Sequence, residues 1–581
     1  MKILLTAINA KYIHSNLAVY SLKAAANAYQ ENVEIAEFTI NNQADYILEE
    51  IYKRKPDVLM CSCYIWNITM VETILAEFHK LCPEVPIWLG GPEVSFEVET
   101  YLELHPEVTG IMMGEGEETF CELCDYYTKD KAEDALQEVL GIAYRNANGE
   151  INVNSWRSIL SMSEIPFCYD EMEDFSNRII YYESSRGCPF SCSYCLSSVD
   201  KKLRFRDLNL VKKELQFFID QKVPQVKFVD RTFNCHHEHA MAIWKYILEH
   251  DNGVTNFHFE ISADLINEEE LALMKCMRPG LIQLEIGVQS TNEVTIREIH
   301  RTMKIERLKE VVKTIKSFGN IHQHLDLIAG LPYEDYETFQ KSFDKIYALE
   351  PNQLQMGFLK VLKGSYMYEH AKEYGILYHN NPPYEVLSTK WLSYDDVLKM
   401  KRIEEMLEVY YNSGQFEIAM KVLRCCYASA FEMFEKLGNF YEEKKLFGMS
   451  HSRIKRCEIL LDFVEKEWQG RDDASELYEC MRQALIFDLY YRENSKSRPV
   501  WAGDVGLFKK VTHFYCKNGK MSHVEPFSYD FIGMEKALPV LQKESLWALF
   551  SYDQRDVLSH QAKVEYVNPA KDMNSKFELG Q

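Results

Sequence analysis

The sequence predicts an α/β protein with two successive series of parallel strands, followed by a mostly helical region with a terminal β-hairpin. Short apolar runs alternate with amphipathic runs over about residues 1–130, and the same alternation returns over 176–365. Near-continuous apolar strands separated by helices are typical of parallel sheets that are covered on both faces. Beyond residue 366 the apolar residues recur at helical spacing. Residues 131–175 are predicted to connect the two series, with a hairpin around Asn148-Gly149.

The first series predicts a doubly wound domain, in which ligands bind outside the carboxyl ends of the strands. The residues at these ends are mostly small, and small residues allow the backbone to lie against a large planar ligand. Ordinary turns of a flavodoxin-like sheet are the alternative interpretation. The predicted strands cover 3–8, 33–40, 58–65, 87–91 and 111–114, a helix closes the series from Glu117, and the candidate ligand-binding residues are Ser62, Gly90, Gly91, Glu115 and Gly116.

The second series contains six strand–helix units, too few for a closed eight-stranded barrel. We therefore expect a partial (β/α)6 barrel with its chemistry at the carboxyl ends of the strands. The predicted strands cover 179–184, 225–230, 257–262, 281–290, 324–330 and 353–361, and the predicted helices cover 207–220, 237–250, 267–276, 304–317 and 335–349.

The first strand of this series leads directly into a loop, 186–195, that contains three closely spaced cysteines. Cys188, Cys192 and Cys195 stand at Cys-x3-Cys-x2-Cys spacing. Thiolates spaced in this way can hold three irons of one cubane, whereas a closed zinc or iron–sulfur site takes four protein ligands. The fourth iron is then open to a substrate or cosubstrate. A zinc site that is completed by a distant histidine or cysteine is the alternative.

This spacing after a β-strand resembles the radical S-adenosylmethionine (SAM) enzymes, in which SAM occupies the open iron. Two later strand ends also resemble that family: Gly-x-Gln-Ser at 287–290 and Asp-Leu-Ile-x-Gly-Leu-Pro at 326–332. The second strand departs from it, because Asp-Arg-Thr at 230–232 replaces the family's Gly-Gly-Glu. For the charged rim residues, a salt bridge without a ligand is the alternative. The resemblance assigns SAM contacts to Tyr194, Asp230, Arg231, Thr232, Glu260, Glu285, Gln289, Gly330 and Leu331.

The first series resembles the cobalamin-binding domains that are fused in front of many radical SAM domains, where the corrin lies over the strand-end loops. Some cobalamin proteins supply a histidine to cobalt from an Asp-x-His-x-x-Gly motif, which this sequence lacks. His14 lies in the corresponding loop without an acidic partner. The resemblance thus implies a [4Fe-4S] cluster, SAM and cobalamin as cofactors, with no protein imidazole on cobalt.

Beyond residue 366, amphipathic stretches predict helices over 394–411, 414–437, 440–468 and 473–492. An Asn-Gly pair at 518–519 between alternating runs predicts a hairpin over 511–521. This region, 366–581, resembles an uncharacterised domain that follows the radical SAM core in some cobalamin-fused members.

Two further patterns invite a chemical interpretation, and for both we favour a structural one. Cys121 and Cys124 form a Cys-x-x-Cys pair, but they fall in an amphipathic run and are expected to pack in a core. His236 and His239 lie one helical turn apart at a helix start, where histidines are more often solvated than metal-bound.

Composition and charge narrow the class of function. The chain has 581 residues, a formal charge of -23, a pI of about 5.3 and sixteen cysteines scattered through apolar patterns. The acidic balance makes nucleic acid an unlikely partner, and the scattered cysteines favour a reducing compartment. The sequence has no run of 18 apolar residues, and its first ten residues do not form a signal peptide. We expect a cytoplasmic enzyme with a small-molecule substrate and no membrane partner.

The function that the resemblance implies is methyl transfer by a cobalamin-dependent radical SAM enzyme. Reductive cleavage of SAM at the cluster gives a 5′-deoxyadenosyl radical, which abstracts hydrogen from an unactivated carbon, and the carbon radical takes methyl from methylcobalamin. A reducing partner such as flavodoxin or ferredoxin is implied. The alternatives are a non-methylating radical oxidation or rearrangement, an enzyme whose first domain has lost cobalamin, and a non-catalytic sensor of the cluster or of cobalamin.

Overall fold

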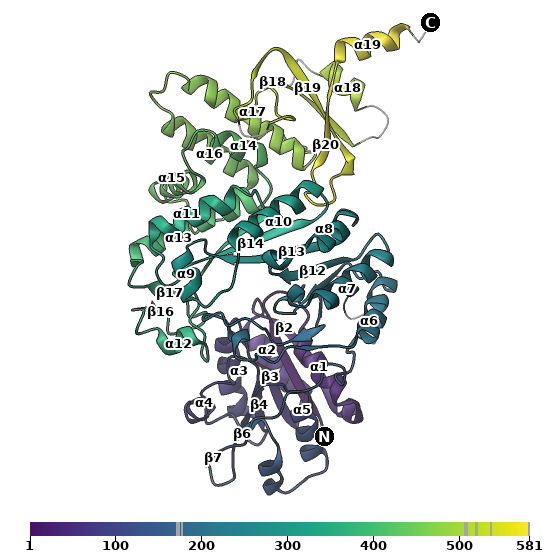
Figure 1. Cartoon of the computed structure of the whole chain (residues 1–581), viewed down its shortest axis with the longest axis vertical. Helices are drawn as coiled ribbons and strands as arrows, with labels where there is room; N and C mark the ends of the chain where they lie inside the picture. The colour runs from purple at the N-terminus through teal and green to yellow at the C-terminus, as the bar shows by residue number, and fades with distance from the viewer. Residues whose placement is uncertain (170–174, 176–177, 505–508, 517–520, 535–536, 579–581) are drawn as a thin grey trace.

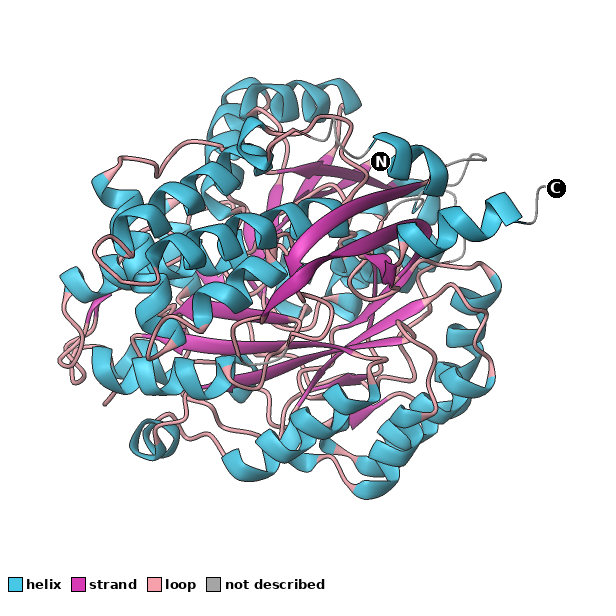
Figure 2. Cartoon of the chain, turned by 90° about the horizontal axis from the view of Figure 1, so that it is seen from above, coloured by secondary structure: helices cyan, strands magenta, loops and turns pink. Residues whose placement is uncertain are grey.

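The computed structural model describes residues 1–581 except 170–174, 176–177, 505–508, 517–520, 535–536 and 579–581. An N-terminal sheet, a central sheet and a C-terminal region follow one another along the longest axis (Figure 1). Viewed from above, helices lie around the outside and the strands run through the middle (Figure 2).

The N-terminal sheet has seven strands in the order β2-β1-β3-β4-β5-β6-β7. β1 to β5 are parallel, and β6 and β7 extend the β5 edge in antiparallel fashion. The strands are β1 Ile3–Asn9, β2 Val33–Thr39, β3 Val58–Ser62, β4 Ile87–Gly90, β5 Gly110–Met112, β6 Ile142–Arg145 and β7 Ile151–Val153.

Helices cover both faces of this sheet and form a separate core on each, which confirms the doubly wound prediction. α1 and α5 pack on one face, and α2, α3 and α4 pack on the other. Cys124 is buried in the first of these cores, with Cys121 at its edge, and neither forms a disulfide, as the packing interpretation expects. The helices are α1 Leu17–Ala25, α2 Ala44–Arg54, α3 Ile68–Leu81, α4 Val98–Leu104 and α5 Glu117–Thr128.

The hairpin around Asn148-Gly149 is confirmed, and it belongs to the N-terminal sheet. Gly149 has a φ of 83° and donates its N–H to the Asn146 carbonyl oxygen at 2.8 Å, which closes the turn. Because β6 pairs with β5, part of the stretch between the two series extends the first sheet.

The central sheet has six parallel strands in the order β15-β14-β13-β12-β11-β8. Each strand lies beside its predecessor in the series, and β8 and β15 remain as edges among the described residues, as a partial barrel requires. The strands are β8 Ile180–Tyr182, β11 Gln225–Phe228, β12 Asn256–Ile261, β13 Ile282–Gln289, β14 His322–Ala329 and β15 Gln353–Phe358, and the helices are α6 Leu208–Asp220, α7 His237–Glu249, α8 Glu268–Lys275, α10 Ile305–Phe318 and α11 Tyr336–Tyr347.

The barrel strands alternate between an apolar outer face and a polar inner face. In β13, Ile282, Leu284 and Ile286 are buried in the core that includes the surrounding helices, whereas Gln283 and Glu285 alternate with them and are partly exposed. The interior of the barrel is therefore lined by polar side chains.

The C-terminal region is mostly helical, as predicted, but the predicted helix over 414–437 is interrupted. α14 ends at Arg424, and Ser429 caps a new helix by accepting a hydrogen bond from Glu432 N. That helix continues past the predicted break near residue 440. The helices are α12 Tyr366–His370, α13 Tyr394–Leu407, α14 Glu417–Arg424, α15 Ala430–Glu443, α16 Arg453–Glu467 and α17 Ala474–Arg492.

The hairpin predicted over 511–521 is wrong in position. Residues Lys509–Tyr515 form α18, because Val511, Phe514 and Tyr515 follow helical spacing, and Asn518-Gly519 lie outside the described residues. The terminal antiparallel structure is a three-stranded sheet, and its elements are β18 Ser522–Tyr529, β19 Leu541–Arg555 and β20 Ala562–Val567, followed by α19 Pro569–Glu578.

The central and C-terminal regions share one hydrophobic core. α15 packs on α11, where the ring centroids of Phe431 and Phe343 are 5.4 Å apart. In the part of the chain that the structure describes, no helix has both the length and the apolar character needed to span a membrane.

Candidate functional site

The cysteine loop follows the first barrel strand and is closed at its base. After β8 the chain forms β9 (Ser185–Arg186), which pairs antiparallel with β10 (Arg204–Phe205). Gly187 has a φ of 87°, and a Cβ at this position would stand 2.5 Å from the Lys202 carbonyl oxygen, so glycine is required. Cys188 N donates to the Asp200 carbonyl oxygen at 3.1 Å.

The loop presents three thiols that form no disulfide. Cys188 and Cys192 are buried, and Cys195 is partly exposed. Within the described parts of the chain, these thiols belong to no group of three ligand atoms that all lie within 4.8 Å of one another. Ligands of a tetrahedral zinc ion lie about 4 Å apart or less, so the three thiols as placed are not gathered around a single zinc position.

Segments far away in the sequence hold the loop in place. Ser193 N donates to the Ile299 carbonyl oxygen at 2.9 Å, and the Ser193 carbonyl oxygen accepts from Met367 N at 2.9 Å. Thr232, which follows β11, places Oγ1 3.8 Å from Cys188 Sγ. The structure thus brings this predicted residue to the cysteines.

Asp230 is fully buried and holds the start of the loop. Its carboxylate accepts hydrogen bonds from Ser184 N at 3.0 Å, Ser184 Oγ at 2.7 Å and Ser185 Oγ at 2.5 Å. Burial raises the pKa of Asp230 to about 6. Arg231, the next residue, is exposed. The side chain of Asp230 therefore has a positioning role, and its hydrogen bonds are used within the protein.

A partly buried arginine that the sequence analysis missed faces the cysteines. Arg301 Nη1 lies 3.8 Å from Cys192 Sγ and 3.3 Å from the Tyr194 hydroxyl oxygen, and Nη2 donates to the Gly287 carbonyl oxygen. Although burial opposes it, the neighbouring Tyr194 and Cys192 raise the pKa of Arg301. Arg301 therefore supplies a positive charge beside the loop, and it follows α9 (Glu293–Glu298) without a recognisable motif.

Gln289 lies next to this arginine, at a bulge in the pairing of β13 with β14. Its φ is 70°, and a Cβ on Gly287 would stand 2.5 Å from Gln289 Nε2. Gln289 Oε1 is buried without a hydrogen-bond partner in the structure. A buried acceptor in this state is destabilising unless a donor reaches it, so this position fits the amino or hydroxyl groups of SAM.

Glu260 and Glu285 are partners across β12 and β13 and lie on the polar inner face of the barrel. Lys227 Nζ is 3.0 Å from Glu285 Oε2 and 3.8 Å from Glu260 Oε1, so both carboxylates take part in a salt bridge. Burial raises the pKa of Glu260 to about 7. Burial also acts to raise the pKa of Glu285, but contacts with His258 and Lys227 lower it to about 2.

Gly330 and Leu331 are covered by the C-terminal region. Gly330 has a φ of 89°, and a Cβ at this position would stand 2.8 Å from Val386 Cγ1 in β17 (Val386–Ser388). Leu331 is completely buried. The glycine of this motif is therefore required by packing against β17.

The predicted residues at the strand ends of the N-terminal sheet lie side by side. Ser62 and Gly90 are partners at the ends of β3 and β4, and both are partly exposed, as is Gly91. A Cβ on Gly91 would stand 2.4 Å from the Cys63 carbonyl oxygen, so this glycine allows two loops to approach closely. Because these residues are small and partly exposed, no large side chain covers this edge of the sheet, and a large planar ligand fits against it.

Two aromatic rings lie at the same edge, of which Tyr64 is partly buried and Trp66 is exposed. Tyr64 and Trp66 follow β3 and stack with ring centroids 4.3 Å apart and planes 6° apart. Trp66 is 43% exposed although its Nε1 donates to the Ile8 carbonyl oxygen at 3.1 Å. A flat, fixed aromatic surface of this kind suits the apolar part of a corrin.

Glu115 and Gly116 lie where the two sheets are joined. Glu115 Oε1 is 2.7 Å from Arg204 Nη1 and 3.4 Å from Arg186 Nη1, and Arg186 Nη2 is 2.6 Å from Glu117 Oε1. A Cβ on Gly116 would stand 3.0 Å from a methyl group of α1. Both arginines flank the cysteine loop, so Glu115 ties that loop to the N-terminal sheet.

His14 makes a second connection between the sheets. Its backbone forms a bridge with Ile179, and its Nδ1 lies 2.6 Å from the Tyr181 hydroxyl oxygen. Burial lowers the pKa of His14, which favours the neutral ring. Together with the arginine contacts, this places the strand-end loops of the N-terminal sheet against the start of the barrel.

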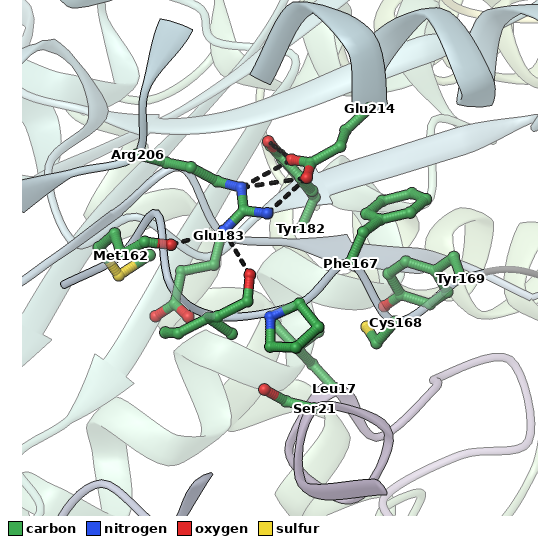
Figure 3. Close-up of a pocket in the computed structure, with 12 residues that line it drawn as sticks. Leu17, Ser21, Met162, Phe167, Cys168, Tyr169, Tyr182, Glu183, Arg206 and Glu214 are labelled. Carbon is green, nitrogen blue, oxygen red and sulfur yellow. Dashed lines mark hydrogen bonds and ion pairs between the residues drawn. The ribbon is translucent and has the colours of Figure 1, made fainter. Parts of the chain in front are cut away.

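A small cavity near this junction has a structural role. Arg206 donates to both oxygens of Glu214, to the Met162 carbonyl oxygen at 2.5 Å and to the Ile165 carbonyl oxygen at 2.8 Å (Figure 3). The cavity beside it has a volume of about 40 Å³, enough for only two or three waters. The hydrogen bonds of Arg206 fix the segment before β8, and the cavity is too small for any of the expected cofactors.

His236 and His239 act as structural residues. His236 Nδ1 caps α7 by accepting from His239 N at 3.3 Å, and His239 Nε2 lies 3.1 Å from Ser184 Oγ. The prediction that the pair is solvated is wrong for His239, which is 4% exposed because it packs against Ser184 at the start of the cysteine loop.

Three families match the chain along its length. The B12 binding domain matches residues 3–124, the Radical SAM superfamily matches residues 182–346, and Protein of unknown function (DUF4080) matches residues 372–563. These matches confirm the predicted domain types and, with them, a [4Fe-4S] cluster, SAM and cobalamin as the cofactors.

Three curated relatives are 23–25% identical to this chain over more than half of its length. An uncharacterized methyltransferase of Pyrococcus horikoshii is 25% identical over 395 residues, which cover 65% of this chain and 82% of the relative. The anaerobic magnesium-protoporphyrin IX monomethyl ester cyclase of Rubrivivax gelatinosus is 23% identical, over 55% of this chain and 59% of the relative. The cobalamin-dependent radical SAM methyltransferase TokK of Streptomyces tokunonensis is 25% identical, over 55% of this chain and 47% of the relative.

The fold has a counterpart among solved structures. OxsB, a cobalamin-dependent S-adenosylmethionine radical enzyme solved with aqua-cobalamin and SAM bound, superposes with a TM-score of 0.57 at 15% identity, covering 84% of this chain and 79% of that structure. The arrangement of the two sheets is therefore a known one. The N-terminal part of the chain thus matches the B12 binding domain, and the central part matches the Radical SAM superfamily.

Proposed function

We propose that this protein is a cobalamin-dependent radical SAM methyltransferase that acts on an unactivated carbon of a small molecule. The observation that carries the proposal is the direct link between the cysteine loop and the strand-end loops of the B12 binding domain, through Arg186, Arg204 and Glu115. When bound together, the cluster, SAM and cobalamin supply a 5′-deoxyadenosyl radical and a transferable methyl group. Two of the relatives are named methyltransferases, which supports this reaction.

The residues of the chain divide the work between three places. Cys188, Cys192 and Cys195 hold the cluster and leave one iron open. Around them, Thr232, Gln289 and the backbone near Asp230 orient SAM, and Arg301 offsets the negative charge of the thiolates. At the strand ends of the N-terminal sheet, Ser62, Gly90, Gly91 and the ring of Trp66 form the surface that binds cobalamin.

We also propose the division of the chain into working units and the source of its electrons. The units are 1–130 together with the hairpin at 142–153, the barrel over 176–365, and 366–581. A flavodoxin or ferredoxin supplies the electron, since no second cysteine cluster of comparable spacing occurs in the sequence.

A non-methylating radical oxidation or rearrangement is the second candidate. It is favoured by one observation, the similarity to a cyclase of the magnesium-protoporphyrin pathway, which is named for ring formation and not for methyl transfer.

The test uses anaerobically reconstituted full-length protein with cobalamin, a reductant and SAM that carries a labelled methyl group. An enzyme releases 5′-deoxyadenosine, and a methyltransferase also moves label onto cobalamin without any added substrate. Release of 5′-deoxyadenosine with no label on cobalamin supports the second candidate. Absence of both products would refute an enzymatic role.

A further inference from the structure

The interior of the barrel contains a second cluster of potential ligands, one layer below the cysteine loop. Glu285, His324 and Asp326 offer three ligand atoms that all lie within 4.8 Å of one another. His258 adds a fourth, because its Nε2 lies 3.1 Å from Glu285 Oε2. These residues occupy inner-face positions on the adjacent strands β12, β13 and β14, and Glu285 and His324 are partners in the sheet register.

The histidine nitrogens in this cluster are buried and unsatisfied. His258 and His324 are 7% and 8% exposed, and Nε2 of each has no hydrogen-bond partner in the structure. Oδ1 of Asp326 also has none, although it lies only 3.0 Å from His324 Nε2. The oxygens are therefore close to the nitrogens but lie away from the direction in which an N–H could donate.

Short separations without hydrogen-bond geometry are what the ligands of one metal ion show. Two donors at about 2.1 Å from a common ion stand about 3.0–3.4 Å apart, depending on the coordination angle. The His258–Glu285 contact of 3.1 Å and the His324–Asp326 contact of 3.0 Å match this spacing. The other pairs among Glu285, His324 and Asp326 lie within 4.8 Å and need small side-chain rotations to reach it. His258 lies outside this group, farther than 4.8 Å from at least one of its ligand atoms, and needs a larger rotation.

The charges that face the cluster also suit a cation. Glu260, Glu285 and Asp326 carry three carboxylates, and Lys227 supplies one ammonium group, 3.0 Å from Glu285. Glu285 and Asp326 are partly buried, so a cation bound between them offsets the cost of removing their charges from water.

We propose that Glu285, His324, Asp326 and His258 form a binding site for a divalent transition-metal ion, separate from the iron–sulfur cluster. Two imidazoles and two carboxylates suit zinc, iron or manganese, whereas calcium and magnesium prefer oxygen ligands alone. Because the site opens onto the inner face of the barrel, an ion in it can hold an oxygen atom of a substrate. The site does not depend on methyl transfer being the reaction.

The test measures metal retained by the full-length protein with its cluster reconstituted. The protein is incubated anaerobically with Zn²⁺ or, separately, Mn²⁺, desalted, and analysed for that metal and for iron by mass spectrometry. The expected result is about one equivalent of one of these metals per chain. His324→Gln and Asp326→Asn weaken its binding at least tenfold and leave the iron content unchanged.

His105→Gln is the matched control, because His105 lies 3.1 Å from Glu107 and 3.5 Å from Glu72 at the surface of the N-terminal domain. This variant is expected to retain the metal. The added metal also raises the melting temperature of the wild type and not of the two ligand variants, which separates lost binding from poor folding. Retention of less than a tenth of an equivalent of both metals, or equal retention by wild type and ligand variants, would overturn the proposal.

Discussion

The N-terminal sheet, in which β1 to β5 are parallel, and the fully parallel central sheet differ in what covers them. Helices pack on both faces of the N-terminal sheet, and every residue of β1 is buried. In the central sheet the helices pack on the outer face, and β13 alternates between buried apolar and partly exposed polar residues. The difference shows where each sheet can bind ligands: the first only at its strand ends, the second at its strand ends and in its interior.

Removal of a thiol tests the strand-end chemistry of the central sheet, and it has the largest expected effect. Cys192→Ala leaves too few ligands for a cubane, so iron falls from about four per chain to less than one and SAM cleavage is lost. Cys235→Ala is the control, because Cys235 follows β11 and lies near the loop without belonging to its motif. Burial and, to a smaller extent, the nearby Cys188 raise the pKa of Cys235 to about 11. Iron content and 5′-deoxyadenosine release measure the result. Loss of iron from Cys235→Ala would show that the cluster is not held by three cysteines alone.

A pair of truncations tests the contrast between the two sheet interiors. Leu59→Ala in β3 removes a fully buried side chain and is expected to cost about 2–5 kcal/mol of unfolding free energy. Gln283→Ala in β13 removes a partly exposed inner-face side chain and is expected to cost about 1 kcal/mol or less. Urea unfolding followed by circular dichroism measures both. Equal effects would mean that the barrel interior is packed as tightly as the first sheet.

The pH dependence of stability tests the role of Asp230 at a strand end. The pKa of Asp230 is about 6 in the folded chain and 3.8 in the unfolded chain, so the folded state holds the proton more tightly. Stability from this group is therefore present below pH 3.8 and is lost as the pH rises through 6, by about 3 kcal/mol. Asp230→Asn is expected to remove this loss from the wild-type profile, measured as unfolding midpoints between pH 4 and 7. An unchanged profile would show that Asp230 ionises normally.

Arg301 sharpens the comparison within the central sheet, with the smallest expected effect. Loss of its charge beside Cys192 makes the reduced cluster less stable, so Arg301→Gln is expected to lower the midpoint potential by some tens of millivolts, where 59 mV is a tenfold change for one electron. Arg301→Lys keeps a charge and is expected to shift it less.

Redox titration followed by electron paramagnetic resonance measures this potential. Arg307→Gln serves as the control, since Arg307 pairs with Glu268 and Glu310 on the outside of the barrel. A shift as large in this control as in Arg301→Gln would contradict the assignment.

The fold of both sheets could be predicted because buried parallel strands appear in the sequence as continuous apolar runs. The cysteine loop could be predicted because its three ligands lie within eight residues of one another. α18 was missed because its apolar residues fit both alternation and helical spacing over so short a stretch, and the helix boundary at Ser429 depends on a single cap.

The rest of the site depends on contacts between distant residues. Arg301 lies 109 residues from Cys192, and nothing in the sequence around it indicates that its side chain returns to the loop. The same holds for Glu115, whose partners Arg186 and Arg204 come from another domain. His258 lies on β12, whereas His324 and Asp326 lie two residues apart on β14. Only the register of the barrel strands brings these residues together.

The hydrogen bond from Met367 N to the Ser193 carbonyl oxygen has a consequence for how the protein is made. Both backbone groups of Ser193 are held by residues that come much later in the chain, Ile299 and Met367. A chain that ends before residue 367 therefore lacks one of these two contacts, so the cysteine loop of a growing chain is less constrained than that of the finished protein.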